Sequence, residues 1–198
     1  MKNIVGVIAV GALVGAAAFT VLTRTDGVRA SHSEAPPATI ERGGYLVNTM
    51  ECHDCHTPWK MGAHGPEPDM SRALSGHPEQ VGTLPATAHS NGPWVWSGAG
   101  TNTAFSGPWG VSYTANLTPD QNTGLGIWTE QMFIQAIRTG KHMGVSRPIN
   151  PPMPWPAYRN ATDADLKAIY AYLRSLKPVA NHVPDYEPPV DTAARSSN

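Results

Sequence analysis

The chain has 198 residues, a formal net charge of −1 and only 15% charged residues. This length supports one compact domain with an additional terminal segment. The sequence contains no stripe of basic residues, which argues against nucleic acid as a partner.

The N-terminal segment is apolar. Residues 4–22 form an uncharged run, and Lys2 is the one charged residue before it. The run is long for the apolar part of a signal peptide and just long enough to span a bilayer as a helix. Residues 28–30 offer a small-x-small cleavage site. We therefore expect 1–30 to be either a signal peptide or an N-terminal hydrophobic helix that anchors the protein, and we expect the protein on the periplasmic side of the inner membrane, anchored or soluble after cleavage.

Residues 31–37 are polar and contain proline, which is typical of a linker before a domain that we place at 38–180. Thr39 is a candidate N-cap for a helix from Ile40 through Met50. Gly43 and Gly44 each cost about 1 kcal/mol in this helix relative to alanine. Close approach of another helix would explain the pair, and a bent or frayed helix is the alternative.

Residues 52–56 read Cys-His-Asp-Cys-His, and C-x-x-C-H is the attachment signature of c-type haem. Cys52 and Cys55 lie about one helical turn apart, so both thiols can reach the vinyl groups of one porphyrin, and His56 can bind the iron. We therefore predict one covalently attached haem c. The alternatives are a zinc site that adds histidines to the two cysteines and a redox dithiol, which would normally follow a strand.

Residues 57–127 are rich in glycine, proline, tryptophan, asparagine and serine, without clear periodicity. We predict a long irregular loop insertion packed on the haem, with a short hairpin compatible with the pattern around 93–113. Four aromatic residues are candidates either for apolar contacts with the haem or for ordinary anchoring of the loop, namely Trp94, Trp96, Trp109 and Tyr113.

Helical signals return near residue 129. Thr129 precedes a segment with an apolar face, and Gly140 follows it as a candidate C-cap. Thr162 and Asp165 form a variant of the capping box for a final helix that Pro178 stops. Apolar residues recur in that helix at i, i+3, i+4 and i+7. These elements predict an all-α fold, and residues 181–198 are predicted to be a proline-bearing tail.

A second iron ligand is suggested by Met153, which lies within residues 150–156 among four prolines. Prolines exclude helix and central strand there and make the segment a stiff extended strap, which can hold a thioether sulfur against a metal. The alternative is a rigid loop that buries an adaptable side chain. Met143 is the next candidate ligand, and His142 lies beside it.

Taken together, these segments resemble the class I c-type cytochromes, in particular the haem domains of cytochrome subunits that serve membrane-bound alcohol and sugar-acid dehydrogenases. The resemblance covers about residues 38–180. The segments that carry it are Gly-Tyr-Leu-Val at 44–47, Cys-His-Asp-Cys-His-Thr at 52–57, the stretches at 113–120 and 124–140, Pro-Met-Pro-Trp at 152–155, and the final helix at 163–176.

The resemblance implies thioether bonds at Cys52 and Cys55, with His56 as proximal and Met153 as distal iron ligand. It also implies that the first and last helices cross near Gly43-Gly44 and Tyr170. Residues 116–120 would then lie along the haem edge. The dehydrogenase subunits carry three haem motifs, whereas this chain has one.

We therefore expect a monohaem electron carrier, rather than an enzyme, that passes single electrons between redox proteins. Its partners would be a dehydrogenase, a quinol-oxidising complex or a terminal oxidase. If Met153 does not bind the iron, a five-coordinate haem enzyme or a sensor of small ligands is the alternative, with His142 as its distal group.

Overall fold

The computed structural model describes residues 35–87 and 93–189, all of which belong to one compact unit that begins at Glu34. The predicted signal peptide or hydrophobic helix at 1–30 and most of the predicted linker lie outside the described residues. Among the residues that are described, no helix has the length and apolar character needed to cross a membrane.

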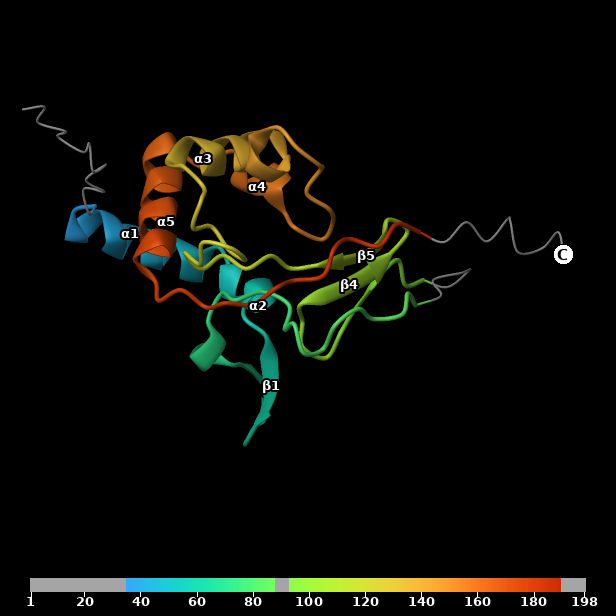
Figure 1. Ribbon diagram of the computed structural model, residues 1–198. Coiled ribbons are helices and arrows are strands. Elements are labelled where there is room, and N and C mark those ends of the chain that lie inside the picture. The colour runs from blue at the N-terminus through green and yellow to red at the C-terminus, as the bar shows by residue number, and fades with distance from the viewer. Residues whose placement is uncertain (1–34, 88–92, 190–198) are drawn as a thin grey trace, which may run out of the picture. The chain divides into compact units, whose positions relative to one another are not determined.

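The described unit contains three long helices and two short ones (Figure 1). Two short 3-10 turns, η1 (Met70–Arg72) and η2 (His142–Gly144), occur between them. The helices in chain order are α1 (Pro37–Thr49), α2 (Cys52–His56), α3 (Glu130–Thr139), α4 (Trp155–Tyr158) and α5 (Asp163–Ser175).

The prediction of an all-α fold is wrong, because residues 57–127 also form two small antiparallel sheets. One is a hairpin of β1 (Trp59–Gly62) and β2 (Gly65–Pro68), and the other has the strand order β3 (Ser97–Gly98), β4 (Ala104–Gly107), β5 (Gly110–Tyr113). These strands are at most four residues long, too short for a period-two pattern to stand out. The β4–β5 pair confirms the hairpin expected around 93–113.

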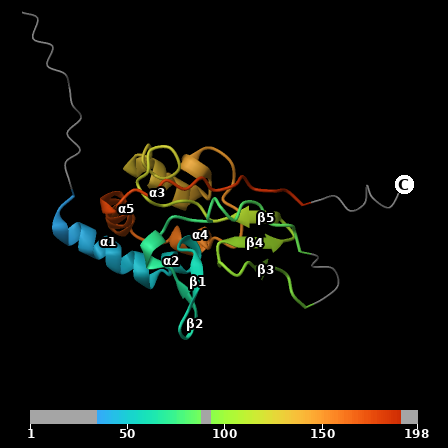
Figure 2. The ribbon, with the colours of Figure 1, turned by 60° about the horizontal axis from the view of Figure 1, so that its bottom comes forward.

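Helices α1 and α5 cross in close contact, as both ribbon views show (Figures 1 and 2). A Cβ atom added to Gly43 would lie 2.0 Å from the carbonyl oxygen of Ala168 and 2.7 Å from the Cβ of Tyr172. This contact confirms close approach as the reason for the glycine pair. Ala168 and Tyr172 flank Tyr170 in the sequence, so the helices cross near the residue that the resemblance indicated.

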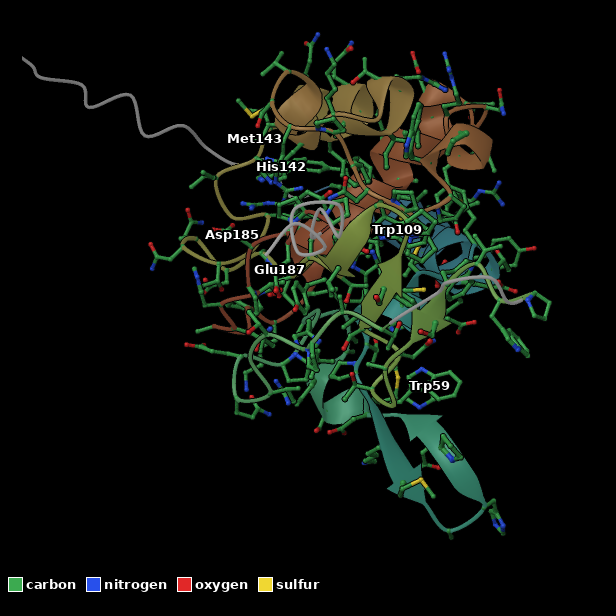
Figure 3. The ribbon with its side chains drawn as sticks, turned by 90° about the vertical axis from the view of Figure 1, so that its right-hand side faces the viewer. Trp59, Trp109, His142, Met143, Asp185 and Glu187 are labelled. Atoms are coloured by element: carbon green, nitrogen blue, oxygen red, sulfur yellow. The ribbon has the colours of Figure 1, made fainter. Side chains whose placement is uncertain are left out.

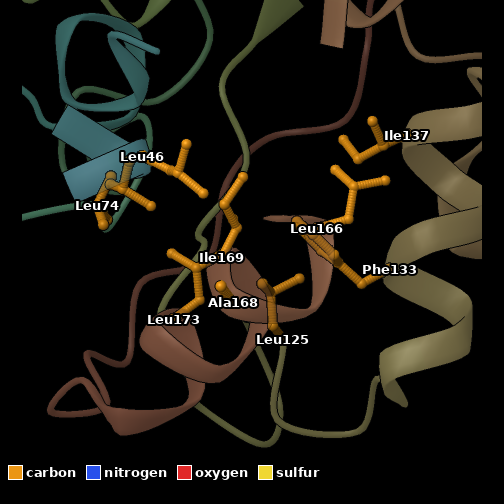
Figure 4. Packing of buried hydrophobic residues seen from close by; sticks show 10 residues of the cluster. Leu46, Leu74, Leu125, Phe133, Ile137, Leu166, Ala168, Ile169 and Leu173 are labelled. Atoms are coloured by element: carbon orange, nitrogen blue, oxygen red, sulfur yellow. The ribbon is translucent and has the colours of Figure 1, made fainter. Parts of the chain in front are cut away.

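The hydrophobic core lies where α1, α3 and α5 meet (Figure 4). Burying one large aliphatic or aromatic side chain contributes about 1.5–3 kcal/mol, so this cluster supplies most of the driving force for the helical arrangement. Two members, Leu74 and Leu125, come from irregular segments. The buried cluster consists of Leu46, Val47, Leu74, Leu125, Phe133, Ile137, Leu166, Ala168, Ile169 and Leu173.

Side-chain caps delimit two of the three long helices as predicted. The Thr129 hydroxyl accepts a hydrogen bond from the Met132 amide, and Gly140 ends α3 with a φ of 67°. The Thr162 hydroxyl likewise accepts from the Asp165 amide at 3.1 Å. The predicted cap at Thr39 is wrong, because α1 begins at Pro37, where the restricted φ of proline suits the first turn of a helix.

Candidate functional site

The two cysteines lie on α2, one helical turn apart, and both are free thiols of intermediate exposure. Burial, with smaller contributions from Cys55 and Asp54, raises the pKa of Cys52 to about 12. Burial also raises the pKa of Cys55. The thiols are therefore neutral at physiological pH, whereas a redox-active dithiol normally has a lowered pKa. This difference argues against the dithiol alternative.

His56 at the end of α2 is 8% exposed, and its Nδ1 lies 2.8 Å from the carbonyl oxygen of Ala115. Because a carbonyl oxygen can only accept, Nδ1 carries the hydrogen and Nε2 keeps its lone pair. Burial lowers the pKa of His56, which favours the neutral ring. A neutral imidazole with a free Nε2 and an Nδ1–H bonded to a carbonyl is the form in which histidine binds a metal.

The Ala115 carbonyl is held in place by backbone pairing between residues 74–77 and 114–117. The amide of His77 donates to the Thr114 carbonyl, and the amide of Leu117 donates to that of Leu74. Gly76, with a φ of 77°, completes the arrangement by donating from its amide to the carbonyl of His56 at 2.8 Å. The backbone of Thr114 lies too close for a side chain at this position, since a Cβ would lie 2.5 Å from its oxygen.

Thr57 joins the cysteine motif to the same segment. Its side chain is fully buried, and its hydroxyl accepts a hydrogen bond from the Leu74 amide at 2.9 Å. The hydroxyl also lies 2.9 Å from Nδ1 of His53. Thr57 and Ala115 lie within segments that carry the resemblance, but no role in supporting His56 was predicted for them or for Gly76. The only signal at Gly76 is a glycine where the backbone needs a positive φ.

Met153 is partly buried and packs against the hydrophobic core, as Cys52 and Tyr158 also do. The Tyr158 hydroxyl donates to the carbonyl of Met50, two residues before Cys52, at 2.5 Å. Burial, together with the nearby Cys52 and Cys55, raises the pKa of Tyr158 to about 12. Helix α4, which follows Met153, is thereby attached to the chain next to the cysteine motif. Because α4 begins at Trp155, the prediction that prolines exclude helix from residues 150–156 is wrong for the last two residues, where Pro156 fits the first turn of a helix. Iron binding by Met153 stays a prediction.

Met143 and His142 lie in η2, the short turn that follows α3. Figure 3 shows Met143 at the edge of the molecule in that view, with His142 next to it. The His142 ring contacts Trp128 edge-on, with 4.9 Å between ring centroids. Burial, with a smaller contribution from Arg147, lowers the pKa of His142. Unlike Met153, Met143 is not among the side chains that pack against the core cluster.

The aromatic residues of the insertion divide into two groups. Trp94 and Trp96 are 78% and 45% exposed. Trp109 donates from Nε1 to the Ser112 hydroxyl, and the Tyr113 hydroxyl donates to Glu187 at 2.5 Å. Tyr113 therefore holds β5 to the C-terminal segment, as the anchoring interpretation predicted, whereas the Trp109 bond is local to the β4–β5 turn.

The residues present fit a covalent haem better than a zinc ion. Within residues 35–87 and 93–189, no three side chains among histidine, cysteine, aspartate and glutamate lie close enough to share a metal ion. The donor set instead comprises two neutral thiols on one helical turn and one neutral imidazole with a free Nε2. These are the groups that covalent attachment and proximal ligation of haem require.

Comparison with known proteins reveals similarity to cytochrome c subunits of dehydrogenases, although no family model matches the chain. One subunit of the nicotinate dehydrogenase of Pseudomonas putida is 41% identical over 147 residues, which cover 74% of this chain and 9% of that protein. The fructose dehydrogenase cytochrome subunit of Gluconobacter japonicus is 30% identical over 176 residues, or 86% of this chain and 29% of that protein.

The cytochrome c subunit of the quinone-dependent alcohol dehydrogenase of Gluconacetobacter polyoxogenes is also 30% identical over 176 residues, which cover 88% of this chain and 29% of that protein. The chain thus spans less than a third of the length of each of these relatives. The named cytochrome subunits agree with the resemblance that the sequence motifs indicated.

Proposed function

We propose that this protein binds one haem c covalently through Cys52 and Cys55 and transfers single electrons, with His56 and Met153 as iron ligands. The observation that carries this proposal is the hydrogen bond from His56 Nδ1 to the Ala115 carbonyl. It leaves Nε2 available directly after a C-x-x-C-H motif. The similarity to cytochrome c subunits supports the same function.

When bound, haem supplies one-electron exchange at its iron. The protein residues have separate tasks. Cys52 and Cys55 hold the group on α2, and the Ala115 carbonyl orients the His56 ring and makes Nε2 a stronger electron donor. Met153, on a proline-rich segment, offers a thioether, which stabilises the ferrous state relative to a second histidine. The core cluster next to both segments keeps water away.

We further propose that the carrier works on the periplasmic side of the inner membrane, since covalent haem attachment takes place outside the cytoplasm. Residues 1–30 would act there as a signal peptide or as an anchor. Its partners would be a dehydrogenase, a quinol-oxidising complex or a terminal oxidase, and it would act as a carrier or subunit rather than as the enzyme. The names of the relatives favour a dehydrogenase partner.

Spectroscopy of the full chain, expressed together with the cytochrome maturation machinery, tests the haem. We expect haem that stays with the polypeptide under denaturing conditions, low-spin spectra in both oxidation states, and slow or absent binding of carbon monoxide. A colourless protein would overturn haem binding. Prompt binding of carbon monoxide to the wild type would overturn six-coordination and favour the five-coordinate alternative.

Two methionine substitutions test the ligand assignment. Met153→Ala is expected to abolish the absorption band between thioether sulfur and ferric iron and to make the iron bind carbon monoxide. Met143→Ala is the matched control and should keep the band. If the control loses the band while Met153→Ala keeps it, Met143 is the ligand and our assignment is wrong.

A further inference from the structure

Asn181, in the segment after α5, has a side chain whose hydrogen-bonding groups are all used. It is 3% exposed. Nδ2 donates to the carbonyls of Ser75 at 2.7 Å and His77 at 2.8 Å. Oδ1 accepts from the Glu79 amide at 2.9 Å and from the Arg72 guanidinium at 3.3 Å. Because two partners only accept and two only donate, the orientation of the amide is unambiguous.

The segment around Asn181 is bonded on its other side to residues 116–123. Asn116 Nδ2 donates to the Val179 carbonyl at 2.8 Å, and the Val179 amide donates to the Thr118 hydroxyl at 3.1 Å. The amide of Asn181 itself donates to the Thr123 hydroxyl at 3.1 Å. Residues 179–181 therefore join 72–79 to 116–123.

The first of these segments pairs with residues 114–117 and so places the Ala115 carbonyl on His56, and the second continues the chain directly after Ala115. Asn181 contacts the carbonyls on both sides of Gly76, whose amide bonds to the carbonyl of His56. The neighbouring backbone pairs set the path of 114–117, from which the Ala115 oxygen reaches His56 Nδ1. Asn181 is thus connected to the backbone of His56 through two hydrogen bonds, one to the residues that flank Gly76 and one from Gly76 to the His56 carbonyl. It also fixes the residues that pair with 114–117, from which the Ala115 carbonyl binds the His56 ring.

We propose that Asn181 is a positioning residue for His56, which keeps the Ala115 carbonyl at hydrogen-bonding distance and thereby sets the electron donation of Nε2 to the iron. This inference rests on the proposed function. A strong Nδ1–H···O bond makes the imidazole a better donor and stabilises ferric iron. Loosening the bond is therefore expected to raise the reduction potential.

The experiment compares Asn181→Ala and Asn181→Asp with Tyr186→Phe in the haem-loaded full chain. Asn181→Asp keeps one acceptor but sets a second oxygen against the Ser75 and His77 carbonyls. Tyr186 lies in the same C-terminal segment and donates to the Trp109 carbonyl, so Tyr186→Phe removes a bond of that segment away from His56. Reduction potential and amide hydrogen exchange at residues 76, 77 and 117 are measured for each protein.

Both Asn181 variants should show an upward shift of the reduction potential and roughly tenfold or faster exchange at these amides, because a buried hydrogen-bond network has lost its donors. Tyr186→Phe should change neither quantity. Should Asn181→Ala not accumulate, Asn181→Asp provides the same two measurements.

Two results would overturn the inference. If exchange becomes faster while the potential stays at the wild-type value, Asn181 only stabilises the fold. If exchange stays slow, Asn181 does not fix the backbone segments that place the Ala115 carbonyl on His56. A wild type without haem absorbance is a separate result, which would refute the proposed function first, so the two failures can be told apart.

Discussion

The region of α1, α3 and α5 and the region of residues 57–127 are stabilised by different interactions. Apolar side chains from the three helices form the buried cluster. In the other region, several buried residues are polar, among them Thr57, His77 and Asn116, and each is hydrogen-bonded. The comparison shows that buried polar side chains bonded to the backbone can take the place, in an irregular segment, of the regular hydrogen bonds of a helix.

The candidate site lies at the boundary between these regions. Cys52 and Cys55 continue the helical region on α2, whereas His56 depends on a carbonyl of the irregular region. Met153 belongs to a third segment, which Tyr158 attaches near the start of the motif. Each region can therefore be disturbed separately, with distinguishable effects on the site.

The largest effect on the helical region is expected from Gly43→Ala. Its Cβ would lie 2.0 Å from a backbone oxygen of α5, which can only be relieved by moving the helices apart. We expect a loss of about 3 kcal/mol in the free energy of unfolding, measured by urea titration. Gly44→Ala is the matched control, because its Cβ would meet the edge of the Tyr172 ring at 3.0 Å, and that ring can shift. Equal losses in both variants would contradict the close helix crossing.

An intermediate effect is expected in the irregular region from His77→Leu. The Nε2 of His77 donates to the Gly82 carbonyl, and its Nδ1 lies 2.9 Å from the hydroxyl oxygen of Thr103. Losing both bonds in a buried place should cost about 2 kcal/mol at neutral pH.

The same variant has a pH signature. Burial lowers the pKa of His77 from its ordinary value of 6.5, so the unfolded chain takes up a proton at a higher pH than the folded protein. The stabilisation from neutral His77 is thus complete above about pH 6.5 and declines as the pH falls toward the folded pKa. Urea midpoints at pH 8, 6 and 5 should therefore fall less steeply for His77→Leu than for wild type.

The pKa values of His53, His56 and His142 are also lowered by burial, and these residues remain in both proteins, so their contribution cancels in the comparison. His64→Gln, at the exposed tip of the β1–β2 hairpin, is the control substitution. Identical slopes for wild type and His77→Leu would show that His77 is not the group responsible.

The smallest effect is expected from Thr162→Ala at the start of α5, which loses the bond from the Asp165 amide. Removing such a cap should cost about 1 kcal/mol. Amide exchange should become faster in the first turn of α5 and stay unchanged at residues 76 and 117. Thr162→Ser keeps the hydroxyl and should recover most of the stability. A failure of serine to do so would show that the methyl group, rather than the cap, matters.

Much of the helical region could be predicted from the sequence. The apolar periodicity and the caps at Thr129 and Thr162 located α3 and α5, because each helix satisfies its own backbone and its signals are local. The start of α1 was misplaced at Thr39, since a proline at the first helical position can replace a polar cap. The strands of 57–127 were too short to produce a recognisable alternation.

For the candidate site, the sequence by itself determined the attachment motif, because the spacing of Cys52, Cys55 and His56 is a property of one helical turn. The tertiary structure alone decided which group supports His56. That group is the backbone carbonyl of Ala115, which no side-chain pattern indicates and which lies 59 residues away. Backbone groups are the same at every position, so pairing among residues 74–77, 114–117 and 179–181 becomes visible only once the chain is folded.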